Sequence, residues 1–182
     1  MATPIMDRCS SVCDVLGTDL VQGAPSEITI VGRMGSIADT NRDELRENSL
    51  RWGAYFASRI EPGERVAICM PTSADFLHCF FGVLYAGGVA VPLPSMIPHK
   101  PEYIAPFLES RAPVINDCGA KFLVTLDELA ETLAGLKDWC EGLETILTPS
   151  DVDASADGFE PAALGHDDLA MLQYTSGSTG NP

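Results

Sequence analysis

The feature that most constrains the fold is the stretch at residues 65–70, which after Arg65 is apolar on both sides of a strand pleat. Strands buried on both faces are typical of parallel sheets whose two sides are covered by helices. Pro71 ends this stretch, and residues 76–85 have a helical pattern that is apolar over most of its circumference. A glycine pair at residues 87–88 ends that helix, and residues 89–91 return as a strand. These elements predict a strand–helix–strand unit.

The same alternation continues to residue 147. Residues 121–125 and 145–147 are predicted strands, and residues 128–140 between them have helical leucine spacing. Four prolines within residues 98–113 permit only a broken helix, which we expect to cover the sheet. The sequence therefore predicts an α/β fold with a largely parallel sheet flanked by helices. Open sheets of this kind bind ligands beyond the carboxyl ends of their strands.

The chain is expected to consist of an N-terminal segment, residues 1–25, and a partial domain, residues 26–182. The N-terminal segment shows no hydrophobic periodicity. Residues 28–31 and 36–40 predict a small hairpin at the start of the domain. A helix with one apolar face is predicted to follow and to end at residues 62–63. That face is formed by Leu45, Trp52, Phe56 and Ile60.

Residues 74–94 are apolar over a length that could span a bilayer. Asp75, His78, the glycine pair and two prolines interrupt the run, so a buried helix followed by a buried strand is favoured and no membrane span is expected. Thr72, with Asp75 three residues later, predicts a capping box at the start of this helix.

The net charge of −15, from 26 acidic and 11 basic residues, excludes binding to nucleic acid or anionic lipid as an expected function. An anionic nucleotide would need a local pocket of donors. The six cysteines lack the spacing of a disulfide framework, and Cys9 and Cys13 are expected to be free thiols in a loose N-terminus rather than metal ligands. Residues 1–15 lack the apolar core of a signal peptide, so a reducing cytoplasmic location is expected.

The last residues carry the strongest chemical signal. Residues 169–174 predict a buried strand that leads into a loop of hydroxyl side chains and glycines. Glycines allow backbone N–H groups to converge on an oxyanion such as a phosphate, and hydroxyls add further donors. The alternative is a flexible polar tail. The candidate binding residues are Thr175, Ser176, Gly177, Ser178, Thr179 and Gly180.

Residues 168–182 resemble the phosphate-loop signature of the adenylate-forming enzymes, and the Leu-Gln-Tyr lead-in is most similar to that of fatty acyl-AMP ligases. Residues 84–94 resemble a second signature of the same superfamily, and residues 63–76 resemble an early strand and helix start. The resemblance covers the chain from about Ile28 to Pro182.

The resemblance implies an ATP-dependent enzyme that joins a fatty or other carboxylic acid to AMP and passes the acyl group to an acyl carrier protein. The loop would hold the β and γ phosphates of ATP. Magnesium is expected in the full enzyme, with its ligand outside this chain. The remaining machinery of the family lies downstream of its phosphate loop, so we expect these residues to be the N-terminal portion of a larger protein and to form no acyl-adenylate alone.

Two alternatives stay open. The parent could be an acyl-CoA synthetase or an amino-acid adenylation domain, or the fold could serve as a non-catalytic scaffold. No catalytic residue is assigned: His78 is expected to be a satisfied core histidine, and His99 and His166 have no partner nucleophile. No metal cluster or Walker loop is present in the sequence pattern, and the glycine pair at residues 87–88 is expected to be structural.

Overall fold

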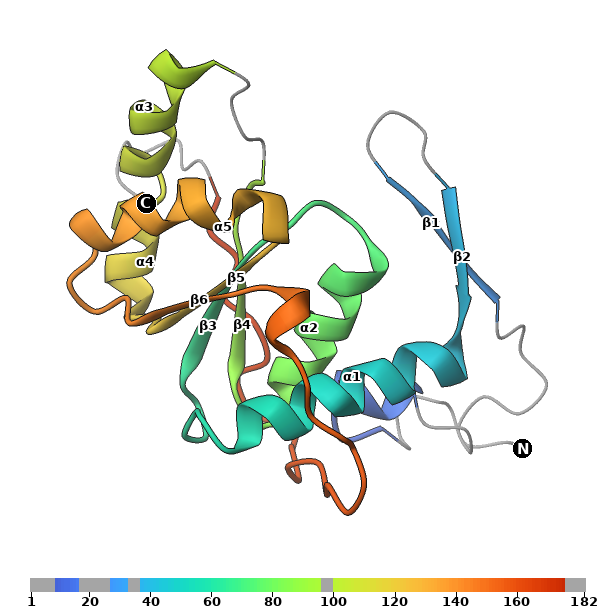
Figure 1. Ribbon diagram of the computed structural model, residues 1–182. Helices are drawn as coiled ribbons and strands as arrows, with labels where there is room; N and C mark the ends of the chain where they lie inside the picture. Colours follow the sequence, from blue (N-terminus) through green and yellow to red (C-terminus); the bar gives the residue numbers. More distant parts are fainter. Residues whose placement is uncertain (1–8, 17–26, 33–36, 96–99, 176–182) are drawn as a thin grey trace, which may run out of the picture.

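The computed structural model describes residues 9–16, 27–32, 37–95 and 100–175. A sheet of four parallel strands, in the order β4-β3-β5-β6, forms its centre (Figure 1). The strands are β3 Arg65–Cys69, β4 Val89–Pro92, β5 Phe122–Thr125 and β6 Thr145–Leu147. The predicted α/β fold with a largely parallel sheet is confirmed.

Two helices that cross closely, α1 (Arg42–Ala57) and α2 (Ala74–Tyr85), cover one face of the sheet. The predicted end of the first helix at residues 62–63 is wrong. The helix ends at Ala57, where Ser58 leaves the helical conformation and the Arg59 N–H donates to the Phe56 carbonyl, three residues back, at 2.7 Å. The predicted apolar face is confirmed by the burial of Leu45, Trp52, Phe56 and Ile60.

Three shorter helices contribute to the opposite face: α3 (Ile104–Glu109), α4 (Ala112–Cys118) and α5 (Asp127–Ala134). The separation of α3 from α4 confirms the broken helix that the prolines predict. Gly119 ends α4 with a left-handed φ of 65°, a conformation that favours glycine. The core cluster on this face includes Phe107, Ile115, Leu123, Leu133 and Leu136.

The N-terminal part confirms one prediction and contradicts another. β1 (Glu27–Val31) and β2 (Ile37–Asn41) pair antiparallel as the predicted hairpin, which projects from the body of the molecule (Figure 1). The expectation of a loose N-terminus is wrong for the 3-10 helix Val12–Leu16. Cys13 and Leu16 are buried in a cluster with α1 and α2, because apolar side chains of that short helix cover the helix pair.

Within the described ranges, no helix is long and apolar enough to cross a bilayer. Residues 74–94 form α2, a turn and β4 instead, as the interruptions in the run predict. Gly87 has a left-handed φ of 80°, and a Cβ placed on Gly88 would lie 2.6 Å from Cδ1 of Ile60. Both glycines therefore have the structural role expected of them.

The cap of α2 differs from the prediction by one residue. Ser73, not Thr72, adopts the extended N-cap conformation, and its hydroxyl oxygen accepts a hydrogen bond from the Phe76 N–H at 3.1 Å. The sequence offered two neighbouring hydroxyl residues, and only the path of the chain after Pro71 selects between them. Ser73 therefore satisfies one of the free N–H groups at the start of the helix.

We expect Ser73→Ala to lower the free energy of unfolding by about 1 kcal/mol, the usual cost of losing an N-cap. Thr72→Ala is the matched control and should change the free energy by less than about 0.5 kcal/mol, because Thr72 is a surface residue without this bond. Urea denaturation of both variants measures the difference. Equal losses in the two variants would contradict this assignment of the cap.

Candidate nucleotide site at the sheet edge

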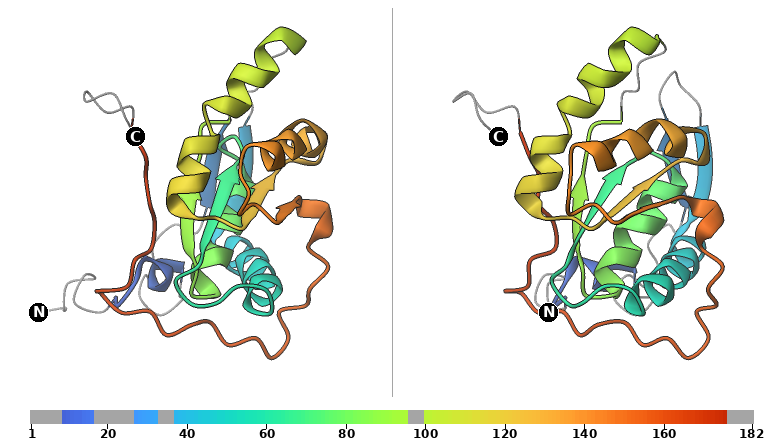
Figure 2. Two further views of the ribbon diagram at one scale, coloured as in Figure 1. Left: turned by 90° about the vertical axis from the view of Figure 1, so that its left-hand side faces the viewer. Right: turned by 60° about the vertical axis from the view of Figure 1, so that its left-hand side comes forward.

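A further extended segment, residues 169–175, runs beside β4 at the edge of the sheet, and we call it the edge segment (Figure 2). Met171 forms a parallel bridge with Ala90. The Ala90 N–H donates to the Ala170 carbonyl and the Leu172 N–H donates to the Ala90 carbonyl, each at 3.0 Å. The chain thus joins the sheet next to β4, on the side opposite β3.

The prediction that this segment is a buried strand is wrong. Leu169 is 50% exposed and Met171 is 38% exposed, and the segment has one bridge rather than a full ladder. Its apolar composition is typical of a central strand. At the edge of the sheet, however, the segment pairs with β4 along one side, and Leu169 and Met171 stay exposed to solvent. Leu172 and Tyr174 alternate with these exposed residues and pack against the core cluster of α3, α4 and α5.

The direction of the edge segment determines where the predicted loop begins. Because the bridge to β4 is parallel, the chain runs from Leu169 toward the carboxyl end of the sheet (Figure 2). Thr175 is exposed at the end of this path. Ligands of open parallel sheets bind beyond this end of the strands. Of the candidate binding residues, Thr175 is described, and residues 176–180 (Ser176, Gly177, Ser178, Thr179 and Gly180) lie outside the described residues.

Tyr174 fixes the end of the edge segment to α4. Its hydroxyl donates a hydrogen bond to Oδ2 of Asp117. Burial, together with this hydrogen bond, raises the pKa of Tyr174 to about 12, so the phenol keeps its proton at neutral pH. The bond joins residues that are 57 positions apart in the sequence. Sequence patterns carried no signal for this pairing.

The connection from β6 to the edge segment, residues 148–168, is mostly exposed, as predicted, but several contacts anchor it to α1 and α2. The Ala162 N–H donates to the Tyr85 carbonyl at 2.8 Å. The ring of Phe159 packs so closely on α1 that a Cβ on Gly53 would lie 2.7 Å from it. Between these contacts the chain crosses α1 and α2, and it then reaches the outer side of β4 (Figure 2).

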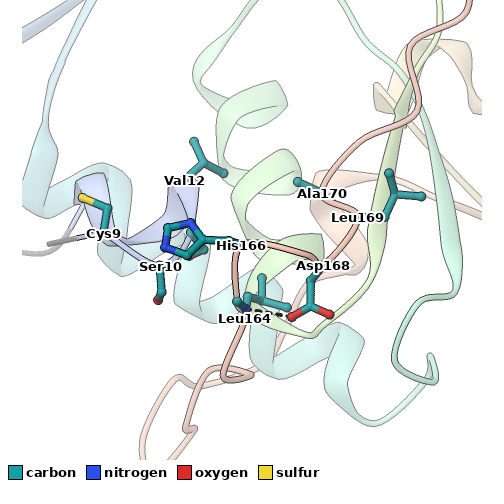
Figure 3. A pocket seen from close by; sticks show the side chains of 10 residues that line it. Cys9, Ser10, Val12, Leu164, His166, Asp168, Leu169 and Ala170 are labelled. Atoms are coloured by element: carbon teal, nitrogen blue, oxygen red, sulfur yellow. Dashed lines mark hydrogen bonds between the residues drawn. The ribbon is translucent and has the colours of Figure 1, made fainter. Parts of the chain in front are cut away.

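A cavity of about 410 Å³ lies between residues 9–12 and residues 164–170 (Figure 3). His166, Asp168 and Leu169 are among its lining residues, and the Asp168 carboxylate accepts a hydrogen bond from the Gly165 N–H at 2.7 Å. The cavity adjoins the start of the edge segment, whereas Thr175 lies at its other end. The cavity and Thr175 are therefore at opposite ends of the edge segment.

The histidines and cysteines were the remaining groups considered for catalysis in the sequence. His78 is largely buried with Nδ1 3.8 Å from Oδ1 of Asp75. Its Nε2 is buried and has no hydrogen-bond partner among the residues that the structure describes, so the prediction of a satisfied histidine is wrong for that atom. His99 lies outside the described residues. The six cysteines are free, as predicted. Burial raises the pKa of Cys69 to about 11 and that of Cys13 to about 12, so both remain thiols at neutral pH.

In the part of the chain that the structure describes, no group of three or more His, Cys, Asp or Glu side chains could hold a metal ion. The described geometry is an extended segment that runs parallel to β4 and reaches the carboxyl end of the sheet, where Thr175 is exposed. The sequence profile described as "AMP-binding enzyme" matches residues 21–182.

The chain belongs to the AMP-binding enzyme family. It is 29% identical over 143 residues to a medium-chain-fatty-acid–[acyl-carrier-protein] ligase of Moorena producens, covering 76% of this chain and 24% of that protein. It is 35% identical over 129 residues to a long-chain-fatty-acid–AMP ligase of Mycolicibacterium smegmatis, covering 67% of this chain and 19% of that protein. The chain thus spans about a quarter or less of the length of these relatives.

The fold of this AMP-binding chain is also that of solved relatives. A structure from work on the fatty acyl-adenylate ligases of E. coli and L. pneumophila superposes with a TM-score of 0.78 at 23% identity. The match covers 94% of this chain and 30% of the ligase. The predicted membership of the adenylate-forming superfamily is confirmed, and the four-stranded sheet with its helices corresponds to the N-terminal part of such enzymes.

Proposed function

We propose that this chain is the N-terminal portion of an ATP-dependent fatty acyl-AMP ligase, and that residues 175–180 bind the β and γ phosphates of ATP. The observation that carries the proposal is the edge segment, which runs parallel to β4 and ends with Thr175 exposed at the carboxyl edge of the sheet. The relatives that act on fatty acids support the choice of a fatty or other carboxylic acid as substrate. We propose residues 26–182 as a partial domain, preceded by the segment of residues 1–25.

The proposed role of the loop is electrostatic. In the reaction, a carboxylate oxygen attacks the α-phosphorus of ATP, the bond from that phosphorus to the bridging oxygen breaks, and pyrophosphate leaves with the electron pair. Backbone N–H groups and hydroxyls held around the β and γ phosphates would stabilise the charge that develops on the leaving group. These donors fit an anion in a chain of net charge −15, because they act locally against the repulsive overall field.

Magnesium, when bound with ATP, would neutralise part of the phosphate charge. This chain's contribution is the set of hydroxyl and N–H donors from Thr175 onward and the edge segment that supports them. We further propose that the acyl group passes to the phosphopantetheine thiol of an acyl carrier protein, because the name of the Moorena producens relative gives an acyl carrier protein as that enzyme's acceptor. The free cysteines are consistent with the proposed cytoplasmic location.

The full-length protein, purified and mixed with ATP, magnesium and fatty acids of several lengths, tests the proposal. We expect mass spectrometry to detect acyl-adenylate, and we expect the acyl group to move to a phosphopantetheinylated carrier protein rather than to coenzyme A. Transfer to coenzyme A would identify an acyl-CoA synthetase. Absence of adenylate with every acid would contradict the proposed function. A polypeptide of these 182 residues alone is expected to form none.

A further inference from the structure

The hydrogen bonds that hold the edge segment to the rest of the molecule lie at two places along it, near Ala170 and Leu172 and at Tyr174. Ala170 and Leu172 bond to Ala90 through their backbones. Among the described residues, the next hydrogen bond along the segment is the one from the Tyr174 hydroxyl to Asp117. Tyr174 directly precedes Thr175, the first residue of the proposed phosphate loop. Of the hydrogen bonds that the described residues make, the Tyr174–Asp117 bond is therefore the one nearest to that loop in the chain.

The partner of Tyr174 belongs to a rigid part of the fold. Asp117 lies in the last turn of α4, between the neighbouring buried positions Ile115 and Cys118. These two side chains belong to the core cluster beneath the sheet, and the Tyr174 ring also packs against that cluster. The helix therefore fixes the backbone of Asp117, whose side chain is exposed, and the phenol reaches the carboxylate from a ring that is held by apolar contact.

We propose that Tyr174 and Asp117 are a positioning pair that holds the start of the nucleotide-binding loop in its ATP-binding conformation. This inference rests on the proposed function of residues 175–180. Neither side chain needs to touch the nucleotide. Donors that are fixed before ATP arrives bind and stabilise charge better than donors that must be ordered on binding, because ordering costs conformational entropy. Among the described residues, loss of the pair would leave the backbone bonds at Ala90 as the last hydrogen bonds before the loop, with the Tyr174 ring held by apolar packing alone.

If Tyr174 and Asp117 act as a positioning pair, four variants of the full-length protein should differ in ATP binding in a defined way. Tyr174→Phe keeps the ring and its packing but removes the donor, and Asp117→Ala removes the acceptor. Asp117→Asn keeps an oxygen acceptor and should retain most of the function. The double variant Tyr174→Phe with Asp117→Ala should be no worse than either single change, because both remove one shared interaction.

We expect Tyr174→Phe and Asp117→Ala to raise KM for ATP about five- to tenfold, within the usual range for loss of one intramolecular hydrogen bond. KM for the fatty acid and the thermal unfolding midpoint should stay near the wild-type values, which separates positioning from a general structural role. Asp138→Ala, an exposed aspartate outside α4, is the matched control. Additive effects in the double variant, or an unchanged KM for ATP, would overturn the inference.

A second readout does not depend on turnover. Hydrogen–deuterium exchange of the amides of residues 175–180 should be about five- to tenfold faster in Tyr174→Phe than in the wild type, if the pair restrains the loop. Unchanged exchange would overturn the positioning role even in a protein that forms no adenylate. Absence of adenylate in the wild type, combined with faster exchange in the variant, would contradict the proposed function while supporting the restraint of the loop by this pair.

Discussion

Gly82→Ala is expected to lower the free energy of unfolding by about 2 kcal/mol, within the range for overpacking a close contact. Gly82 lies in α2, where α1 crosses it. A Cβ at this position would lie 2.3 Å from Cβ of Trp52 and 3.2 Å from the backbone N of Gly53. Because the second of these is backbone, the two helices would have to move apart.

Whether Gly82→Ala lowers or raises the free energy of unfolding tests how closely α1 and α2 pack. Alanine is a better helix former than glycine by about 1 kcal/mol, so without the close crossing the substitution would stabilise α2. Gly142→Ala is the matched control, since nothing lies within 4 Å of the position a Cβ would take there. Urea denaturation of both variants gives the comparison. Increased stability of Gly82→Ala would show that the helices do not pack as closely as the structure has them.

The largest expected effect on activity comes from the proposed phosphate loop. Thr175→Val in the full-length protein should reduce the rate of acyl-adenylate formation about 100-fold, since removing one donor to developing charge typically costs on the order of 3 kcal/mol. Thr175 is exposed, so stability should change by less than about 0.5 kcal/mol. Single-turnover measurement of adenylate formation at saturating ATP tests this expectation.

Thr29→Val is the matched control for that experiment. Thr29 is also exposed and also uses its hydroxyl, which donates to Asp39 across the β1–β2 hairpin at 2.9 Å, but it belongs to a different sheet from the proposed site. Its substitution should leave adenylate formation at the wild-type rate. A rate for Thr175→Val within about threefold of the wild type would correspond to less than about 1 kcal/mol and would argue against the hydroxyl as a donor to the phosphates.

The central sheet could be predicted from sequence because its strands are apolar on both faces. Val66 and Ile68 face the helix pair, whereas Ala67 and Cys69 face the other core cluster, so both halves of the pleat carry the signal. The sequence also predicts where the helices lie, but not the residues at which they begin and end. Ser73 and Thr72 have similar capping chemistry, and backbone path alone separates them.

The site was predictable only in part. The hydroxyl and glycine sequence after Tyr174 suggested the phosphate loop, and residues 169–174 suggested a strand, but composition could not distinguish an edge position from a central one. The Tyr174–Asp117 hydrogen bond depends on the packing of α4 beside the edge segment, so local patterns could not indicate it. In the same way, the burial of Cys13 depends on α1 and α2, which follow it in the chain.

The most direct test of the central claim is the exchange of radiolabelled pyrophosphate into ATP by the full-length protein. Pyrophosphate returns to ATP only if adenylate formation is reversible at a site that holds both groups. We predict exchange that depends on a fatty acid and that falls about 100-fold in Thr175→Val, as expected for loss of one donor. Exchange that stays at background with every acid supplied, or that is unaffected by Thr175→Val, would contradict the account.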